Sequence, residues 1–204
     1  MTTLTNMPQA RFKQTPSQTV GPFFAYGLTP EQYGYDLQSL FSPTLARPHA
    51  AGEHIRITGQ VFDGNGQSVL DAVVEISQVD ARGQPTRTLA GVEAKGFTGF
   101  GRCGTGTLAQ NHYAFQTVKP GAAAAGQAPY INGCVTMRGL LLHTFTRIYF
   151  DDEAVANASD PVLASVPEAR RATLLATRSV DGGGVCYRFD IRMQGPAETV
   201  FFDL

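Results

Sequence analysis

The sequence predicts an all-β protein: an antiparallel β-sandwich with an extended N-terminal arm and one or two short helices. Three observations support this fold class. Short segments in which apolar and polar residues alternate recur from residue 54 onward, glycine-rich turns separate them, and only two segments carry helix-start signals. Many short alternating strands joined by such turns are typical of two-layered antiparallel sheets.

Residues 1–50 form the arm in this prediction, as part of the same unit as the sandwich of residues 51–204. The arm is rich in proline, threonine, glutamine and aromatic residues and shows little sustained periodicity. One short helix is expected from Thr29, because 29–32 reads TPEQ. This order offers an N-cap hydroxyl, a first-turn proline and a reciprocal acceptor three residues on.

Strands are expected wherever apolar side chains alternate with polar ones. The first begins at His54, where Ile55, Ile57 and Val61 share one face. The clearest lies at 185–193 and is amphipathic along its whole length. The others are expected at 72–79, 113–118, 134–138 and 144–150, with turn signals at 63–66 (DGNG) and 80–83 (DARG).

The second expected helix begins near Ser165. Residues 165–168 read SVPE, which matches a capping box, and the apolar residues Ala172, Leu174 and Leu175 carry the helical pattern to about Arg178. The 204 residues suffice for one domain with a sizeable core.

Composition excludes several classes of function. The formal net charge is −1 and there is no dense run of lysine and arginine, so nothing favours binding to nucleic acid or to an anionic membrane. No window approaches the roughly 18 apolar residues that span a bilayer. The N-terminal residues also lack the apolar segment of a secretory signal. We therefore expect a cytoplasmic protein.

Residues that could bind metals or react are scattered. The three cysteines, Cys103, Cys134 and Cys186, show no CxxC spacing, so free thiols are expected rather than disulfides or a zinc site. The four histidines are far apart, so no His-based metal site is apparent.

Two local motifs have ordinary interpretations. Residues 99–104 (GFGRCG) match the spacing of a dinucleotide-binding loop, but a strand-like segment follows where a helix is needed, so we expect a glycine-rich connection. The acidic triplet 151–153 could recruit a hard cation, yet a solvated turn beside a helix N-terminus is the preferred interpretation. Taken alone, the residues offer no catalytic set.

Longer stretches carry a family resemblance. They are TPSQTVGPFF at 15–24, GQVFDGNGQSVLDAVVEISQVDARG at 59–83, FTGFGRCGTGTLAQNHYAFQTVKPG at 97–121, HTFTRIYFDDE at 143–153 and YRFDIRMQGPAETVFFDL at 187–204. From about Thr15 to its end, the chain resembles the intradiol ring-cleaving dioxygenases. The resemblance implies a β-sandwich that, in catalytic members, holds one non-haem ferric iron through two tyrosines and two histidines.

This chain departs from the family at all four ligand positions. Matching the motifs places Pro85 and Ala123 at the tyrosines, and Tyr130 and Asn132 at the histidines. The resemblance therefore implies a vacated site, no metal bound by this chain and no catalytic residue in it. The four consecutive alanines at 122–125 then fill space next to that site.

The resemblance also implies a partner. A chain of this kind pairs with an iron-bearing beta subunit, in a multimer of heterodimers, and Fe(III) belongs to that partner. The pair cleaves protocatechuate (3,4-dihydroxybenzoate) with O₂ to 3-carboxy-cis,cis-muconate, in aromatic catabolism. Thr19, Gly21 and Pro22 would line the partner's substrate pocket. Arg138 would bind the substrate carboxylate.

Alternatives remain at each point. The TVGPF segment at 19–23 could be only an ordered interface turn, Arg138 a structural ion-pair partner, and Tyr130 and Asn132 interior hydrogen-bonding residues. The whole chain could be an inactive sandwich that binds an aromatic acid or only stabilises another protein. It could also be a self-sufficient dioxygenase with unrecognised ligands.

Overall fold

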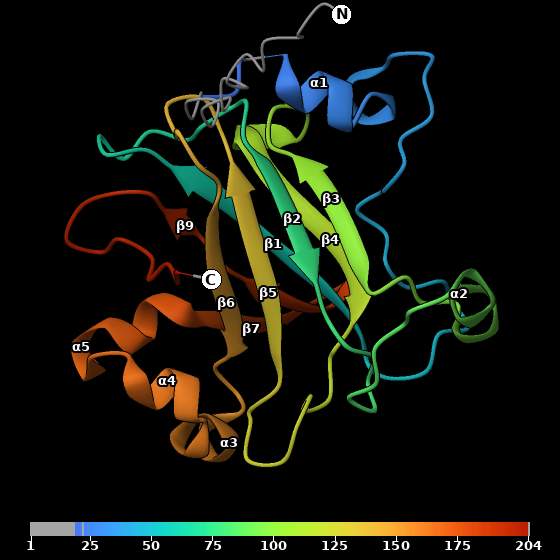
Figure 1. Cartoon of the computed structure of the whole chain (residues 1–204), viewed down its shortest axis with the longest axis vertical. Helices are drawn as coiled ribbons and strands as arrows, with labels where there is room; N and C mark the ends of the chain where they lie inside the picture. Colours follow the sequence, from blue (N-terminus) through green and yellow to red (C-terminus); the bar gives the residue numbers. More distant parts are fainter. Residues whose placement is uncertain (1–18, 22, 204) are drawn as a thin grey trace, which may run out of the picture.

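Nine strands dominate the part of the chain that the structure describes, residues 19–21 and 23–203 of a computed structural model (Figure 1). Pro22, one of the predicted substrate-contacting residues, lies outside the described residues. The strands are β1 His54–Phe62, β2 Val73–Ser77, β3 Phe100–Gly104, β4 His112–Val118, β5 Tyr130–Thr136, β6 Thr144–Phe150, β7 Leu175–Asp181, β8 Gly184–Arg188 and β9 Ile191–Arg192.

The strands pair in the order β3-β2-β5-β6-β7-β8-β1-β4, with β9 beside β1. The prediction of an antiparallel sheet is wrong in part, because β1 runs parallel to β8 and β9, and β6 runs parallel to β7. Parallel neighbours need a long crossover. The β6–β7 crossover contains three helices, α3 Ala154–Ser159, α4 Pro161–Ser165 and α5 Glu168–Arg171.

The sheet folds into two layers, with β7 passing from one to the other (Figure 1). The first layer is β3-β2-β5-β6 and the second is β8-β1-β4. One core cluster takes Val74 and Ile131 from the first layer and Ile57 and Phe115 from the second. Alternation along each strand therefore buries one face of each layer between them and leaves the other face outside.

Both predicted helix starts are wrong. The Thr29 hydroxyl donates 2.8 Å to the Ala25 carbonyl at the end of helix α1 (Phe24–Leu28), and only a 3₁₀ turn, η1 (Glu31–Tyr33), follows. Ser165 is the last residue of α4 and donates 2.7 Å to the Val162 carbonyl. In both cases the hydroxyl satisfies a helix C-terminal carbonyl rather than an N-terminal amide.

The predicted helix to Arg178 is also wrong beyond its first turns. After α5, a 3₁₀ turn η3 (Ala172–Leu174) leads directly into β7. Leu174 is fully buried in a second apolar cluster beneath the helices, and Leu175 pairs with Tyr149 of β6. The apolar residues that suggest a helical period thus serve a buried turn and the start of a strand.

Two further strand predictions need correction. Residues 100–104 form β3 rather than a loop, and a Cβ at Gly101 would lie 2.4 Å from Leu45 Cδ1, so a larger residue there would force the buried Leu45 side chain to shift. The predicted strand 185–193 is split into β8 and β9. Asp190 lies at the break, where its carboxylate accepts a hydrogen bond from the Gln60 amide at 3.1 Å.

Two elements complete the description. Helix α2 (Leu89–Lys95) lies beside the sheet, and η2 (Ala109–Asn111) connects β3 to β4. No helix in residues 23–203 is both long and apolar enough to cross a membrane.

Candidate functional site

The outer face of the first layer carries the vacated metal-ligand positions. Strand β5 turns Ile131 and Val135 into the core, so Tyr130, Asn132 and Cys134 point outward. Their cross-strand neighbours follow from register. Asn132 pairs with Ser77 of β2 on one side and with Arg147 of β6 on the other.

Three of the four vacated positions meet in one pocket. A cavity of about 220 Å³ is lined by Ser77, Gln78, Val79, Ala123, Tyr130 and Asn132. The alanine run is held there by its neighbour turn, since the Gly121 amide donates 3.0 Å to the Asp80 carbonyl. Pro85 is exposed after that turn and does not line the cavity.

The donor atoms of this pocket do not fit a ferric ion. Ala123 offers a methyl group, Asn132 a neutral amide and Tyr130 a single phenol. Cys134 points outward on the same face, but burial, followed by the charge of Glu75, raises the pKa of its thiol to about 11, so it stays protonated. Within the described residues, no group of three or more His, Cys, Asp or Glu side chains could hold a metal.

A guanidinium occupies this face instead. The Arg147 Cζ lies 4.0 Å from the centroid of the Tyr130 ring, and Nη1 donates 3.3 Å to the Tyr149 hydroxyl. That hydroxyl donates 3.0 Å to Oδ1 of the buried Asp160. Burial is the main reason that the pKa of Tyr149 rises to about 12, so the phenol keeps its proton. Sequence reasoning missed Arg147 because only the register places it here.

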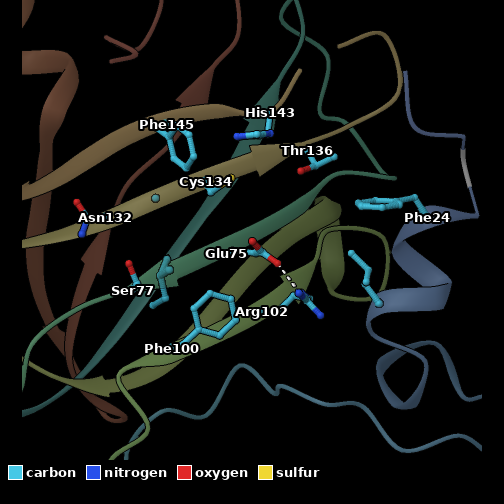
Figure 2. A pocket seen from close by; sticks show the side chains of 13 residues that line it. Phe24, Glu75, Ser77, Phe100, Arg102, Asn132, Cys134, Thr136, His143 and Phe145 are labelled. Atoms are coloured by element: carbon cyan, nitrogen blue, oxygen red, sulfur yellow. Dashed lines mark hydrogen bonds and ion pairs between the residues drawn. The ribbon is translucent and has the colours of Figure 1, made fainter. Parts of the chain in front are cut away.

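A larger groove adjoins the vacated pocket. About 600 Å³ lies between α1 and the outer face of the first layer, and the groove shares Ser77 and Asn132 with the pocket (Figure 2). Its floor holds an ion pair in which Arg102 Nε donates 2.6 Å to Glu75 Oε1. Aromatic residues line much of the rest: Phe24, Phe100, His143 and Phe145. Sequence reasoning missed this groove, because one of its walls is helix α1 of the N-terminal arm.

Two of the predicted substrate-contacting residues come close together. The Gly139 amide, next to Arg138 in the β5–β6 hairpin, donates 2.8 Å to Thr19 Oγ1. Arg138 is 59% exposed, and its Nε lies 3.2 Å from Oδ2 of Asp71, which is only 5% exposed. Gly21 is exposed and accepts a hydrogen bond from the Phe24 amide. Sequence reasoning missed Asp71. The substrate contacts of Thr19, Gly21 and Arg138 stay a prediction.

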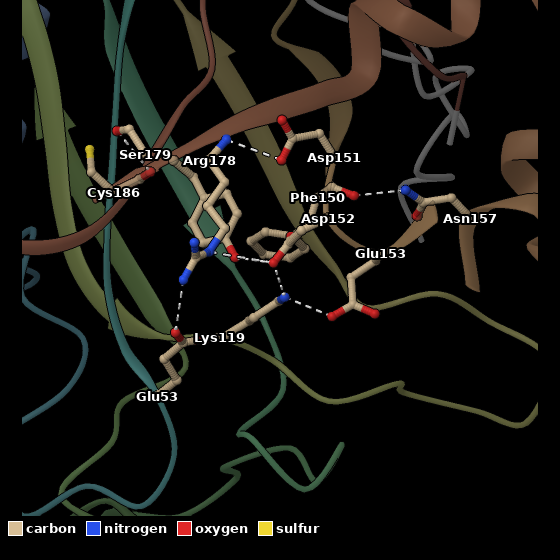
Figure 3. A network of polar contacts seen from close by, with 11 residues as sticks. Glu53, Lys119, Phe150, Asp151, Asp152, Glu153, Asn157, Arg178, Ser179 and Cys186 are labelled. Carbon is tan, nitrogen blue, oxygen red and sulfur yellow. Dashed lines mark hydrogen bonds and ion pairs between the residues drawn. The ribbon is translucent and has the colours of Figure 1, made fainter. Parts of the chain in front are cut away.

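The acidic triplet forms an exposed turn directly before α3, as the sequence predicts, but two of its carboxylates pair with a lysine rather than only with solvent. Lys119 Nζ lies 2.9 Å from Asp152 Oδ2 and 2.6 Å from Glu153 Oε1 (Figure 3). Asp151 Oδ1 accepts from the Arg178 amide at 3.1 Å. Burial alone would raise the pKa of Asp152, but hydrogen bonds from Lys119 and Tyr187 hold it below its usual range. The ammonium group of Lys119 thus neutralises the carboxylates that were considered as ligands for a metal cation.

Relatives were found by sequence, although no protein-family model matches the chain. A protocatechuate 3,4-dioxygenase alpha chain from Burkholderia cepacia is 63% identical over 193 residues, 94% of this chain and 98% of that relative. The alpha chain from Pseudomonas putida is 45% identical over 204 residues, 97% of this chain and all of that one. A protocatechuate 3,4-dioxygenase beta chain from B. cepacia is 32% identical over 157 residues, 71% of this chain and 66% of that relative.

Solved structures share the fold. The dioxygenase domain of a dioxygenase and carbohydrate-binding fusion from Streptomyces sp. SirexAA-E superimposes with a TM-score of 0.57 at 21% identity, over 88% of this chain and 97% of that one. Catechol 1,2-dioxygenase from Pseudomonas arvilla C-1 gives 0.52 at 17% identity, over 80% and 62%. The strand-rich architecture is therefore that of the intradiol dioxygenases.

Proposed function

The chain belongs to the family of protocatechuate 3,4-dioxygenase alpha chains, and from this premise we propose that it is the non-iron-binding subunit of an O₂-dependent intradiol dioxygenase. Its partner is an iron-bearing beta subunit, and the two assemble as a multimer of heterodimers in the cytoplasm. The substrate is protocatechuate. Its ring opens between the two hydroxylated carbons, and both oxygen atoms of O₂ enter the product, 3-carboxy-cis,cis-muconate.

The observation that carries this proposal is the 63% identity over nearly the whole chain to an alpha chain whose beta chain is a separate protein. The beta relative is itself 32% identical to this chain, which is consistent with two homologous subunits facing each other. The donor-poor pocket at Ala123, Tyr130 and Asn132 supports the assignment of Fe(III) to the partner. When bound there, the ferric ion supplies a chelation point for the two ring hydroxyls.

The contribution of this chain is to bind and orient the substrate. The Arg138 Nε lies 3.2 Å from Asp71 Oδ2 and the Arg138 side chain is 59% exposed, so its guanidinium can offer a bidentate contact to the protocatechuate carboxylate. Thr19 fixes the arm beside the Arg138 hairpin. Gly21 and Pro22 then offer a flat, rigid surface to the ring. Holding the acid in one orientation reduces the entropy that must be lost on reaching the reactive geometry.

Reconstitution tests the proposal. This chain is co-expressed with a beta-type chain that carries a Pro-Gly-x-Tyr turn and a His-x-His strand, and O₂ uptake on protocatechuate is measured for each chain and for the pair. We expect iron-dependent uptake that needs both chains. Full activity of the beta chain alone would reduce this chain to a structural or aromatic-acid-binding partner. Stoichiometric iron in the isolated chain, counted by elemental analysis, would indicate a self-sufficient dioxygenase.

A further inference from the structure

We propose that the Arg147 guanidinium is a fixed cation beside the vacated pocket, and that its charge keeps metal out even where ligands are restored. This inference concerns the alpha-type chain itself. It does not depend on which residues contact protocatechuate or on which partner holds iron.

The strand register puts Arg147 beside the vacated pocket, on the β6 side of Tyr130 and Asn132. Arg147 pairs directly with Asn132, and Tyr130 lies two residues away on the same face of β5. Such diagonal neighbours on an antiparallel pair are within reach of a long side chain. The guanidinium uses that reach to cover the Tyr130 ring at 4.0 Å. It is therefore next to both positions that correspond to histidine ligands.

The Arg147 guanidinium is anchored by a chain of hydrogen bonds through Tyr149 to Asp160. Tyr149 accepts from Arg147 Nη1 and donates to Asp160 Oδ1, and the Tyr149 side chain is fully buried. Asp160 is fixed in turn by the amides of Ala128, Val162 and Leu163, at 3.0, 3.0 and 2.8 Å. A side chain anchored through a buried tyrosine and an N-cap aspartate has little freedom to move aside for a metal ion.

The charge of Arg147 is also not neutralised by a direct ion pair. Among the described residues, no carboxylate lies within salt-bridge distance of its guanidinium, because the neutral Tyr149 hydroxyl stands between Arg147 and Asp160. The ring face of Tyr130 attracts the guanidinium but leaves its net charge intact. A ferric ion bound beside Tyr130 and Asn132 would be repelled by the guanidinium, which no carboxylate in the described part of the chain contacts directly.

The test restores ligands while keeping Tyr130. Ala123→Tyr and Asn132→His add a phenol and an imidazole to the pocket that Tyr130 already lines. This double variant of the full chain is prepared with its partner, with and without Arg147→Gln. Ferric nitrilotriacetate is the probe. Binding is followed by the visible phenolate-to-iron charge-transfer band and by iron counted above that of the unmodified assembly.

We expect the variant with Arg147→Gln to bind iron at least ~100-fold more tightly than the same variant with arginine retained. Arg147→Lys keeps the charge and should still block binding, whereas Arg147→Met is a second neutral variant and should permit it. Arg188→Gln removes one positive charge on β8, from an exposed pair with Asp190, and should leave binding as weak as before. Circular dichroism checks that each variant is folded.

Three results would overturn the proposal. The double variant with arginine could bind iron as tightly as the variant with Arg147→Gln. The second is that the double variant with Arg147→Gln or Arg147→Met binds iron no more tightly than the double variant with arginine. Finally, Arg147→Lys could bind as well as Arg147→Gln, in which case the shape of the guanidinium, rather than its charge, would be responsible.

Discussion

Thr19 and Gly139 lie 120 residues apart in the sequence and are joined by one hydrogen bond, from the Gly139 amide to Thr19 Oγ1 at 2.8 Å. This contact connects the N-terminal arm to the hairpin that presents Arg138. The two segments proposed to face the partner's pocket therefore form one surface in the isolated chain.

Removing the Arg138 guanidinium should weaken substrate binding in the assembled enzyme. We expect Arg138→Ala to raise KM for protocatechuate by roughly one to two orders of magnitude, since a hydrogen bond to a charged group contributes about 1.5–3 kcal/mol. Steady-state O₂ uptake measures the change. Arg188→Ala, in an exposed ion pair on β8, is the matched control and should leave KM alone. An unaltered KM for Arg138→Ala would make Arg138 a purely structural partner of Asp71.

The Thr19 hydroxyl should matter through position rather than through stability. Thr19→Val keeps the shape but removes the acceptor for the Gly139 amide, while Thr19→Ser retains it. Because both groups are exposed, we expect the free energy of unfolding to change by less than about 0.5 kcal/mol. We expect KM for protocatechuate to rise several-fold in Thr19→Val only. Equal kinetics for the two variants would argue against a fixed arm.

Lys119 should be a stabilising residue, because it joins the end of β4 to the turn after β6. Its side chain is 14% exposed and neutralises both Asp152 and Glu153. Lys119→Met leaves these carboxylates side by side, and we expect a loss of about 1–3 kcal/mol in urea unfolding. Arg56→Met removes the exposed Arg56–Asp181 pair and should cost less than ~1 kcal/mol. Similar losses in the two variants would contradict this difference.

Asp152 of this cluster and Asp80, which pairs with Lys95 elsewhere in the structure, give a pH dependence whose sign is fixed. Hydrogen bonds outweigh burial at Asp152 and Asp80 and hold the pKa of each below its usual value. The unfolded chain therefore takes up protons first, so this stabilisation is complete above about pH 4 and is lost as the pH falls through the lower folded values.

The measurement is the acid unfolding profile. Compared with the unmodified chain, the variant Asp80→Asn with Asp152→Asn should be less stable at neutral pH and should lose less stability between neutral pH and about pH 3. Parallel profiles for the two proteins would show that these carboxylates do not govern acid sensitivity.

Much of the sheet could be predicted because local alternation of apolar and polar residues identifies its strands. In β1, burial follows the alternation of side chains along the strand, so apolar periodicity was enough. Strand β7 was missed because after Ala176 its side chains are exposed and largely polar, while an apolar run before it suggested a helix. Strand direction was missed for a different reason. Whether β8 lies parallel to β1 depends on the connections between the strands, and the residues of the two strands do not encode it.

The site divides in the same way. Ala123, Tyr130 and Asn132 could be matched to ligand positions by motif, and they do share a pocket. Arg147 and Asp71 could not be found, because each acts through a partner far away in the sequence. Arg147 reaches Tyr130 only through the β5–β6 register, and Asp71, in the loop before β2, meets Arg138 of the β5–β6 hairpin only in the folded chain.

The passage of β7 between the two layers has a consequence for how this protein folds. The early strands β1 and β2 belong to different layers, and they are connected into one sheet only through β7 and β8, which are synthesised after β1 to β6. Until residues 175–188 emerge from the ribosome, β1 and β6 each have an open edge, and open edges invite intermolecular pairing. Chains released prematurely, before this closing segment, are therefore expected to aggregate.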